Sequence, residues 1–256
     1  MPDAASLTVC AAGFIAAVMN SIAGGGTMLT FPALLGAGLP GVLANTTSTV
    51  ALFIGMPGSI WAFRKQMAGL GPWLWPLGII SLLGGLAGGM LLLAMPPGVF
   101  DAVVPWLLIL ATFLFVANGP LQRWLRGKTL AAEEPERPAR WGLAFQSVVA
   151  VYGGYFGAGI GIMMLAGLSL LGLHRINRMN AIKAVLASLV NLASVVYFIV
   201  KGQVHWPLAL WLMGGSIPGY FVGGHLAQKI PGSWVRTIVA VIGFGIAVSL
   251  LIRRHA

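Results

Sequence analysis

Long apolar runs separated by short polar breaks make up nearly the whole chain. Each run is long enough for a helix to cross about 30 Å of hydrocarbon at about 1.5 Å per residue. The pattern therefore predicts an all-α polytopic membrane protein. The runs, in chain order, are Leu7–Leu39, Ala44–Phe63, Pro72–Met95, Val99–Gly119, Trp141–Leu173, Ala181–Val200, Trp206–Leu226 and Trp234–Ile252.

Glycine clusters interrupt two of these runs. The first cluster, Gly24–Gly26, lies inside NSIAGGGTMLTFPALLGAGLP, and the second lies at Gly157–Gly161. Glycine costs a helix about 1 kcal/mol per residue relative to alanine, so each cluster predicts a break. An unbroken helix over Leu7–Leu39 would be about 50 Å long, too long for one crossing without steep tilt. We therefore expect a hairpin of two part-helices.

The second half of the chain also resembles the first half. GGGTML (Gly24–Leu29) aligns with GIGIMM (Gly159–Met164), and WPL at Trp75 aligns with WPL at Trp206 after a slip of a few residues. Duplicated units are common in transporters, where the substrate site lies at the repeat interface on broken helices. The predicted divisions are a first membrane repeat at residues 1–121, a charged extramembrane linker at 122–140 and a second membrane repeat at 141–256.

The distribution of basic residues distinguishes two topologies. If each unit contains a glycine-broken hairpin plus three transmembrane helices, the repeats are inverted, and twelve of the 15 Lys and Arg residues share one side. If each unit contains four simple spans, the repeats are parallel and the split is ten to five. Cytoplasmic loops carry the excess of Lys and Arg in membrane proteins. This rule favours inverted repeats, with both termini outside the cytoplasm.

The composition argues against several other classes of protein. The formal charge of +10 arises from residues at segment ends, which is typical of membrane topology and not of a nucleic-acid partner. A single cysteine, Cys10, and scattered histidines give no metal-ligand spacing. The five acidic residues lie at segment starts, at the N-terminus or in the linker, so we expect no carboxylate relay, no catalytic constellation, no metal and no cofactor.

The candidate binding site combines the glycine clusters with the polar starts of the following helices. Unwound glycines would expose backbone N–H groups, such as those of Thr27 and Ile162, at the positive end of a half-helix, which suits an anion. Lys183 has no acidic neighbour in sequence, so a bound anion would supply its partner. The candidates are Gly24, Gly25, Gly26, Thr27, Asn45, Thr46, Thr47, Ser48, Gly159, Gly161, Asn180 and Lys183.

Two alternative interpretations remain open for these residues. The glycines would also suit close helix packing through small residues. Lys183 would also suit a position at the membrane interface, where its side chain extends to water beside Arg175 and Arg178.

Two stretches resemble the signature regions of the TauE/SafE sulfite exporter family of small bacterial membrane transporters. They are GFIAAVMNSIAGGGTMLTFPALLGAGLPGVLANTTSTVA (Gly13–Ala51) and GGYFGAGIGIMMLAGLSLLGLHRINRMNAIKAVLAS (Gly153–Ser188). The second departs from the first by carrying Gly167 where Pro32 stands. The resemblance covers nearly the whole chain. It implies transport of sulfite, thiosulfate, sulfoacetate or other sulfonates across the bacterial inner membrane.

These observations together predict a secondary transporter that exports a small sulfur-containing oxyanion or organosulfonate by alternating access, with one repeat rocking against the other. An inside-negative potential drives a monoanion outward by about 2.3 kcal/mol per 100 mV. The alternatives are uptake of an organic sulfonate or carboxylate, and an integral-membrane enzyme or assembly subunit. The expected partners are a small anionic substrate and the lipid bilayer.

Overall fold

The structure is a computed structural model that describes residues 4–22, 25–96, 98–127 and 134–226. Within these residues all regular elements are helices, which confirms the all-α prediction for this part of the chain. The predicted run Trp234–Ile252 lies outside it. The elements are α1 (Ala4–Ile22), α2 (Thr27–Gly36), α3 (Gly41–Phe53), α4 (Met56–Ala62), the 3₁₀ helix η1 (Arg64–Met67), α5 (Gly71–Ala94), α6 (Val99–Gly127), α7 (Arg140–Tyr155), α8 (Ile160–Leu170), α9 (Ile176–Val200) and α10 (Trp206–Leu226).

The helices suit a membrane by length and surface. Three of the described helices, α1, α5 and α9, contain windows long and apolar enough to cross a bilayer. The side chains of Trp75, Phe113 and Phe221 are each more than two-thirds exposed. Large exposed apolar faces of this kind are unfavourable in water and favourable against lipid. The predicted membrane protein is therefore consistent with the three spans found among the described residues.

The two predicted breaks occur where the glycine clusters lie. The first long run becomes α1 and α2, and the run Trp141–Leu173 becomes α7 and α8. Gly25 has φ of +88°, and Gly157 and Gly159 both have φ of +79°. Only glycine adopts this left-handed conformation without strain, so these residues turn the chain out of one half-helix and into the next.

The two pairs of half-helices have their outer ends at opposite ends of α5. The turn after α8 lies beside the linker, where the N–H of His174 donates to Glu134 Oε1 at 3.0 Å. The start of α5 is at this same end, because Trp73 Nε1 donates to the Pro135 carbonyl at 3.1 Å. Gly41, just after α2, packs instead against Asp101, beyond the far end of α5.

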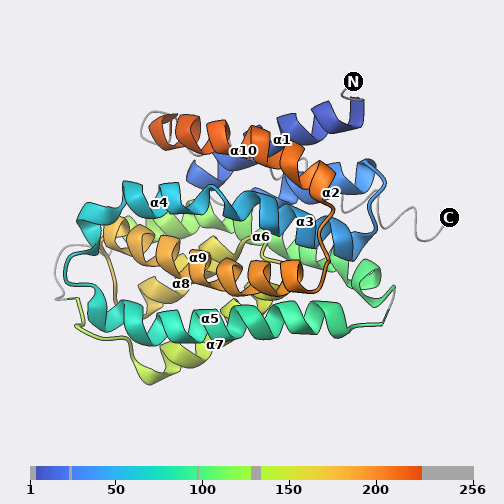
Figure 1. Ribbon diagram of the computed structural model, residues 1–256. Coiled ribbons are helices and arrows are strands. Elements are labelled where there is room, and N and C mark those ends of the chain that lie inside the picture. The colour runs from blue at the N-terminus through green and yellow to red at the C-terminus, as the bar shows by residue number, and fades with distance from the viewer. Residues whose placement is uncertain (1–3, 23–24, 97, 128–133, 227–256) are drawn as a thin grey trace.

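The most extensive helix contacts join elements that are far apart in sequence. In Figure 1, α1 and α10 lie side by side at one edge, and α5 and α7 lie at the opposite edge. Glycines allow both contacts: a methyl group added at Gly215 of α10 would collide with the Cys10 carbonyl of α1, and one at Gly88 of α5 with the Val151 carbonyl of α7. Each break-containing pair is thus held by a long helix from the other half of the chain.

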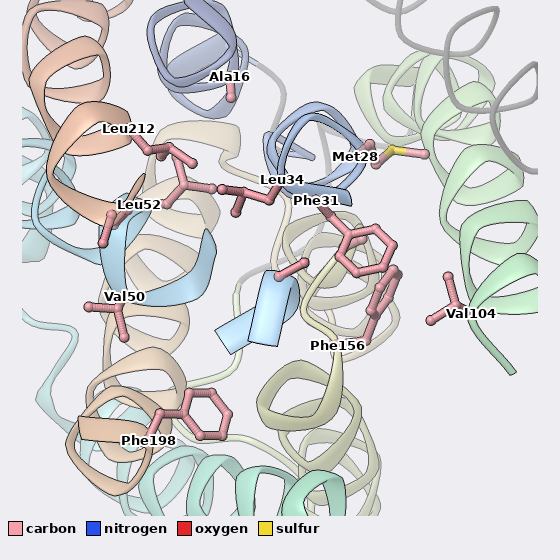
Figure 2. Close-up of a cluster of buried hydrophobic side chains, with 14 of the residues drawn as sticks. Ala16, Met28, Phe31, Leu34, Val50, Leu52, Val104, Phe156, Phe198 and Leu212 are labelled. Atoms are coloured by element: carbon pink, nitrogen blue, oxygen red, sulfur yellow. The ribbon is translucent and has the colours of Figure 1, made fainter. Parts of the chain in front are cut away.

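A cluster of aromatic rings joins the two halves in the core. Figure 2 shows Phe31 of α2 beside Phe156, which follows α7. Their ring centroids lie 5.8 Å apart in an edge-to-face arrangement, and Phe100 of α6 lies 6.2 Å from Phe31. All three side chains are buried. Edge-to-face pairs stabilise a core beyond the area that they bury, so the cluster fixes α2 against the second break.

Candidate functional site

A cavity of about 100 Å³ lies between the two helix breaks. Its walls come from the helices α1, α2, α3, α4, α8, α9 and α10 and from residues between them. The lining residues are Asn20, Ser21, Gly25, Thr27, Thr49, Leu52, Met56, Ser59, Phe63, Gly157, Ile160, Gly161, Lys183, Ala184, Ala187, Ser188, Asn191 and Tyr220.

The cavity brings together four of the residues that the sequence nominates: Gly25, Thr27, Gly161 and Lys183. They come from both breaks and from α9, and therefore from both halves of the chain. Gly24 lies outside the described residues. The nominated residues that do not line the cavity are Gly26, Asn45, Thr46, Thr47, Ser48, Gly159 and Asn180.

The polar residues at the start of α3 bond to neighbouring backbone and side chains. Asn45 Nδ2 donates to the Tyr155 carbonyl at the end of α7, at 3.0 Å. Thr47 Oγ1 accepts from the His205 N–H at 3.0 Å, and the Ser48 and Thr30 hydroxyls lie 2.5 Å apart. Thr46 bonds to carbonyls of its own helix. In this structure the hydroxyls and the amide hold helices together instead of facing the cavity.

One of the two backbone donors expected at the breaks is open: the N–H of Thr27 has no acceptor among the described residues. The N–H of Ile162, expected to be open, donates to the Gly159 carbonyl at 3.0 Å because α8 has already begun there. The N–H of Gly26 donates to Asn20 Oδ1 at 2.7 Å. Gly161 lies at the start of α8, where no helical partner exists, and its N–H has no acceptor among the described residues. Gly161, and not Ile162, therefore offers an open N–H donor at the cavity wall on the side of the second break.

Lys183 supplies the positive charge of the cavity. It lies seven residues into α9, about 10 Å from the start of that helix at about 1.5 Å per residue. Its side chain crosses Gly161, where an added methyl group would lie 3.3 Å from Lys183 Cδ. Among the described residues, no acceptor or acid contacts its ammonium group. A charge at this depth without a partner is costly, which makes Lys183 a candidate functional residue.

Comparison with known proteins places this chain in a family. Residues 9–250 match the family described as sulfite exporter TauE/SafE. The chain belongs to this family. No solved structure matches it.

Three curated relatives align over nearly their whole lengths. A probable membrane transporter protein of Haemophilus influenzae is 28% identical over 91% of this chain and 89% of its own. Probable membrane transporter protein ORF9 of a Sinorhizobium species is 26% identical over 94% of this chain and 90% of its own. Probable membrane transporter protein YfcA of Escherichia coli K12 is 24% identical over 94% of this chain and 87% of its own.

Several residues that line the cavity of this TauE/SafE chain are not predicted by any local pattern in the sequence. Asn20 Nδ2 donates to the Tyr220 hydroxyl at 3.1 Å, which joins α1 to α10 at the cavity wall. These two residues stand near opposite ends of the chain, and no local pattern predicts their contact. Asn191 follows Lys183 on α9 at an offset of eight, which recurs on one helix face, so helical spacing from Lys183 could have found it. Ser188 follows at an offset of five and does not share that spacing.

The arginine nearest to Lys183 along α9 is already paired. Arg178 forms an ion pair with Glu134 of the linker, the only one among the residues that the structure describes. Glu134 also accepts from the backbone N–H groups of His174 and Arg175. Burial raises the pKa of the Glu134 carboxyl, but these hydrogen bonds and the Arg178 charge outweigh it, so the pKa falls below its ordinary value. Glu134 thus caps the helix that carries Lys183 and leaves Lys183 alone.

Proposed function

We propose that this chain is a secondary transporter that exports a small sulfur-containing oxyanion or organosulfonate across the bacterial inner membrane by alternating access. The observation that carries the proposal is the unpaired ammonium of Lys183 in a cavity between two helix breaks. Membership of the TauE/SafE family supports the substrate class. The names of the curated relatives support membrane transport.

The chemistry of the cavity favours an anion. Lys183 contributes a full positive charge, and the open N–H of Gly161 lies at the N-terminus of α8, where the helix dipole is positive. No acidic side chain occurs among the residues that line the cavity. A small anion would therefore neutralise Lys183 without displacing a protein partner, whereas a cation would be repelled by the ammonium of Lys183.

Repeated backbone geometry supports the duplication. The turn after α2 and the turn after α8 have the same hydrogen bonds: the Leu39 N–H donates to the Leu34 carbonyl, and the Leu173 N–H to the Leu168 carbonyl, both at 3.1 Å. Both turns follow the second half-helix of a broken pair, so they occupy matching places in the two units. The outer ends of the two break-containing pairs lie at opposite ends of α5. This arrangement favours inverted repeats over 4+4 simple spans.

The packing suggests which parts move. Rocking of residues 1–121 against 141–256 as rigid bodies would separate α1 from α10 and α5 from α7, the most extensive contacts among the described helices. We therefore assign α1 with α10 to one moving unit, and α5 with α7 and α9 to the other. The cavity lies between these units, since Tyr220 belongs to the first and Lys183 to the second. Relative motion of the two units would expose it to each side in turn.

Flux of sulfite and thiosulfate in proteoliposomes under a clamped membrane potential tests the proposal. A charge-assisted hydrogen bond contributes about 1.5–3 kcal/mol, so we expect Lys183→Met to raise the half-saturating concentration by about 10- to 150-fold. Lys201→Met is the matched control, because Lys201 ends the same helix and contacts the Tyr197 ring outside the cavity. An inside-negative potential should drive anions outward.

Each of the following three outcomes would contradict one part of the proposal. Equal flux in Lys183→Met and wild type would show that the anion does not bind at Lys183. Absence of flux for either anion in wild type would contradict the small-oxyanion substrate. Flux that ignores the potential would contradict potential-driven export.

A further inference from the structure

Three of the five serine and threonine hydroxyls in the cavity wall already donate their protons. Ser21 donates to the Ala17 carbonyl at 3.0 Å, Thr49 to the Asn45 carbonyl at 2.9 Å, and Ser188 to the Ala184 carbonyl at 2.8 Å. A carbonyl oxygen can only accept, so the hydroxyl is the donor in each bond. A hydroxyl has one proton and two lone pairs. Towards the cavity these three oxygens can therefore only accept.

Donors in the same cavity come from other groups. The ammonium of Lys183 offers three N–H bonds and has no acceptor among the described residues. The Tyr220 oxygen accepts from Asn20 Nδ2 at 3.1 Å, which leaves its own proton free to donate. The N–H of Gly161 adds a third donor. The wall thus presents donors from Lys183, Tyr220 and Gly161 and accepting oxygens from Ser21, Thr49 and Ser188, beside the hydroxyls of Thr27 and Ser59, which can donate or accept.

The accepting oxygens come from three helices of the wall. On α9, Ser188 lies five residues beyond Lys183, about 7.5 Å along the axis at about 1.5 Å per residue. The other two accepting oxygens come from α1 and α3. A ligand held by the ammonium of Lys183 therefore shares the cavity with three oxygens that can accept a hydrogen bond from it.

We propose that this site prefers anions that carry their own hydrogen-bond donor, an O–H or N–H group a few bonds from the anionic group, such as a hydroxyalkanesulfonate. A sulfonate or oxyanion without such a donor would leave the lone pairs of Ser21, Thr49 and Ser188 unmatched once water is displaced. Unmatched buried polar atoms oppose binding, whereas one ligand O–H would satisfy an acceptor. This inference rests on the proposed anion transport at the same site and specifies the class of substrate.

Two probes that differ by one hydroxyl group test the inference. Ethanesulfonate and 2-hydroxyethanesulfonate have the same charge and carbon skeleton, and each is assayed for uptake into or release from proteoliposomes holding the full chain. One net hydrogen bond predicts a half-saturating concentration about twofold to tenfold lower for the hydroxylated probe. The ratio between the two probes cancels any difference in the amount of folded protein.

Variants of the accepting oxygens locate the effect. In Ser188→Ala and in Thr49→Val we expect the ratio between the probes to fall towards one. Ser147→Ala is the matched control, because Ser147 makes the same kind of bond to the Leu143 carbonyl, at 2.9 Å, but does not line the cavity. We expect Ser147→Ala to retain the wild-type ratio.

The outcomes separate this inference from the proposed function. Equal half-saturation for both probes in wild type would overturn the donor preference and leave anion transport standing. A preference that persists in both Ser188→Ala and Thr49→Val would also overturn it. Failure of wild type to transport either probe, together with failure on sulfite and thiosulfate, would overturn the proposed function and the inference with it.

Discussion

A single methyl group added at the α1–α10 contact should measurably lower the melting temperature of the protein. A methyl group added at Gly215 would lie 2.9 Å from both the Cys10 carbonyl carbon and the Phe14 backbone nitrogen, and nearer still to the Cys10 carbonyl oxygen. Ordinary van der Waals contact begins at 3.4 Å, so the two helices would have to move apart to admit the methyl group. The opposing atoms belong to backbone and cannot move aside as a side-chain end can.

The neighbouring glycine provides a matched control. Gly214 lies in the same helix, and an added methyl group there would meet nothing within 4 Å. Both substitutions gain about 1 kcal/mol of helix propensity, so the difference between Gly215→Ala and Gly214→Ala isolates the packing cost. Overpacking of a close contact costs about 1–3 kcal/mol. With about 2–4 °C per kcal/mol for a chain of this size, we expect Gly215→Ala to melt about 2–12 °C below Gly214→Ala.

Thermal unfolding of the purified protein in one detergent, followed for both variants beside wild type, measures this difference. If Gly215→Ala melts at or above the temperature of Gly214→Ala, then α1 and α10 are not in backbone contact. The assignment of these helices to one moving unit would fail with that result.

Two further predictions concern residues outside the cavity. Because the pKa of Glu134 lies below its ordinary value, the carboxylate stabilises the fold at neutral pH, and that contribution is lost as pH falls through the lowered pKa. Wild type should therefore unfold at a higher temperature than Glu134→Gln at pH 7, and equal melting temperatures there would contradict the capping role. Asn45→Ala removes the partner of the buried Tyr155 carbonyl and should lower the free energy of unfolding by about 1–3 kcal/mol, while the half-saturating concentration of the anion stays unchanged. A large rise in that concentration would instead make Asn45 a ligand.

The helix breaks could be predicted from the sequence because glycine acts locally. Gly25, Gly157 and Gly159 need only their own missing side chains to adopt positive φ, so a cluster of glycines within an apolar run is enough to locate each break. The lack of a charged partner for Lys183 could be anticipated for a similar reason. Its charge is unmatched in the neighbouring sequence, and the structure provides no distant acid among the described residues to match it.

The rest of the cavity could not be predicted because it depends on contacts between distant segments. Asn45, Thr47 and Ser48 look like ligands in sequence, since their polar groups open a membrane helix. In the structure their partners are Tyr155, His205 and Thr30, the first two of which lie in the other half of the chain. A polar residue in an apolar helix must find a partner, but the sequence does not say whether that partner is a substrate or another helix.

The charge asymmetry of the cavity follows from one difference between matching positions. Ser48 and Lys183 occupy equivalent places in the two apolar units when Gly24 is aligned with Gly159. Ser48 is short and uncharged, so the Thr30 hydroxyl satisfies it and both are buried. The lysine side chain is too long and too strongly hydrated to be buried against Thr30 in the same way. It instead packs across Gly161 and reaches the cavity. Two similar helix breaks thus enclose one cation, Lys183, and the proposed single monoanion would balance its charge.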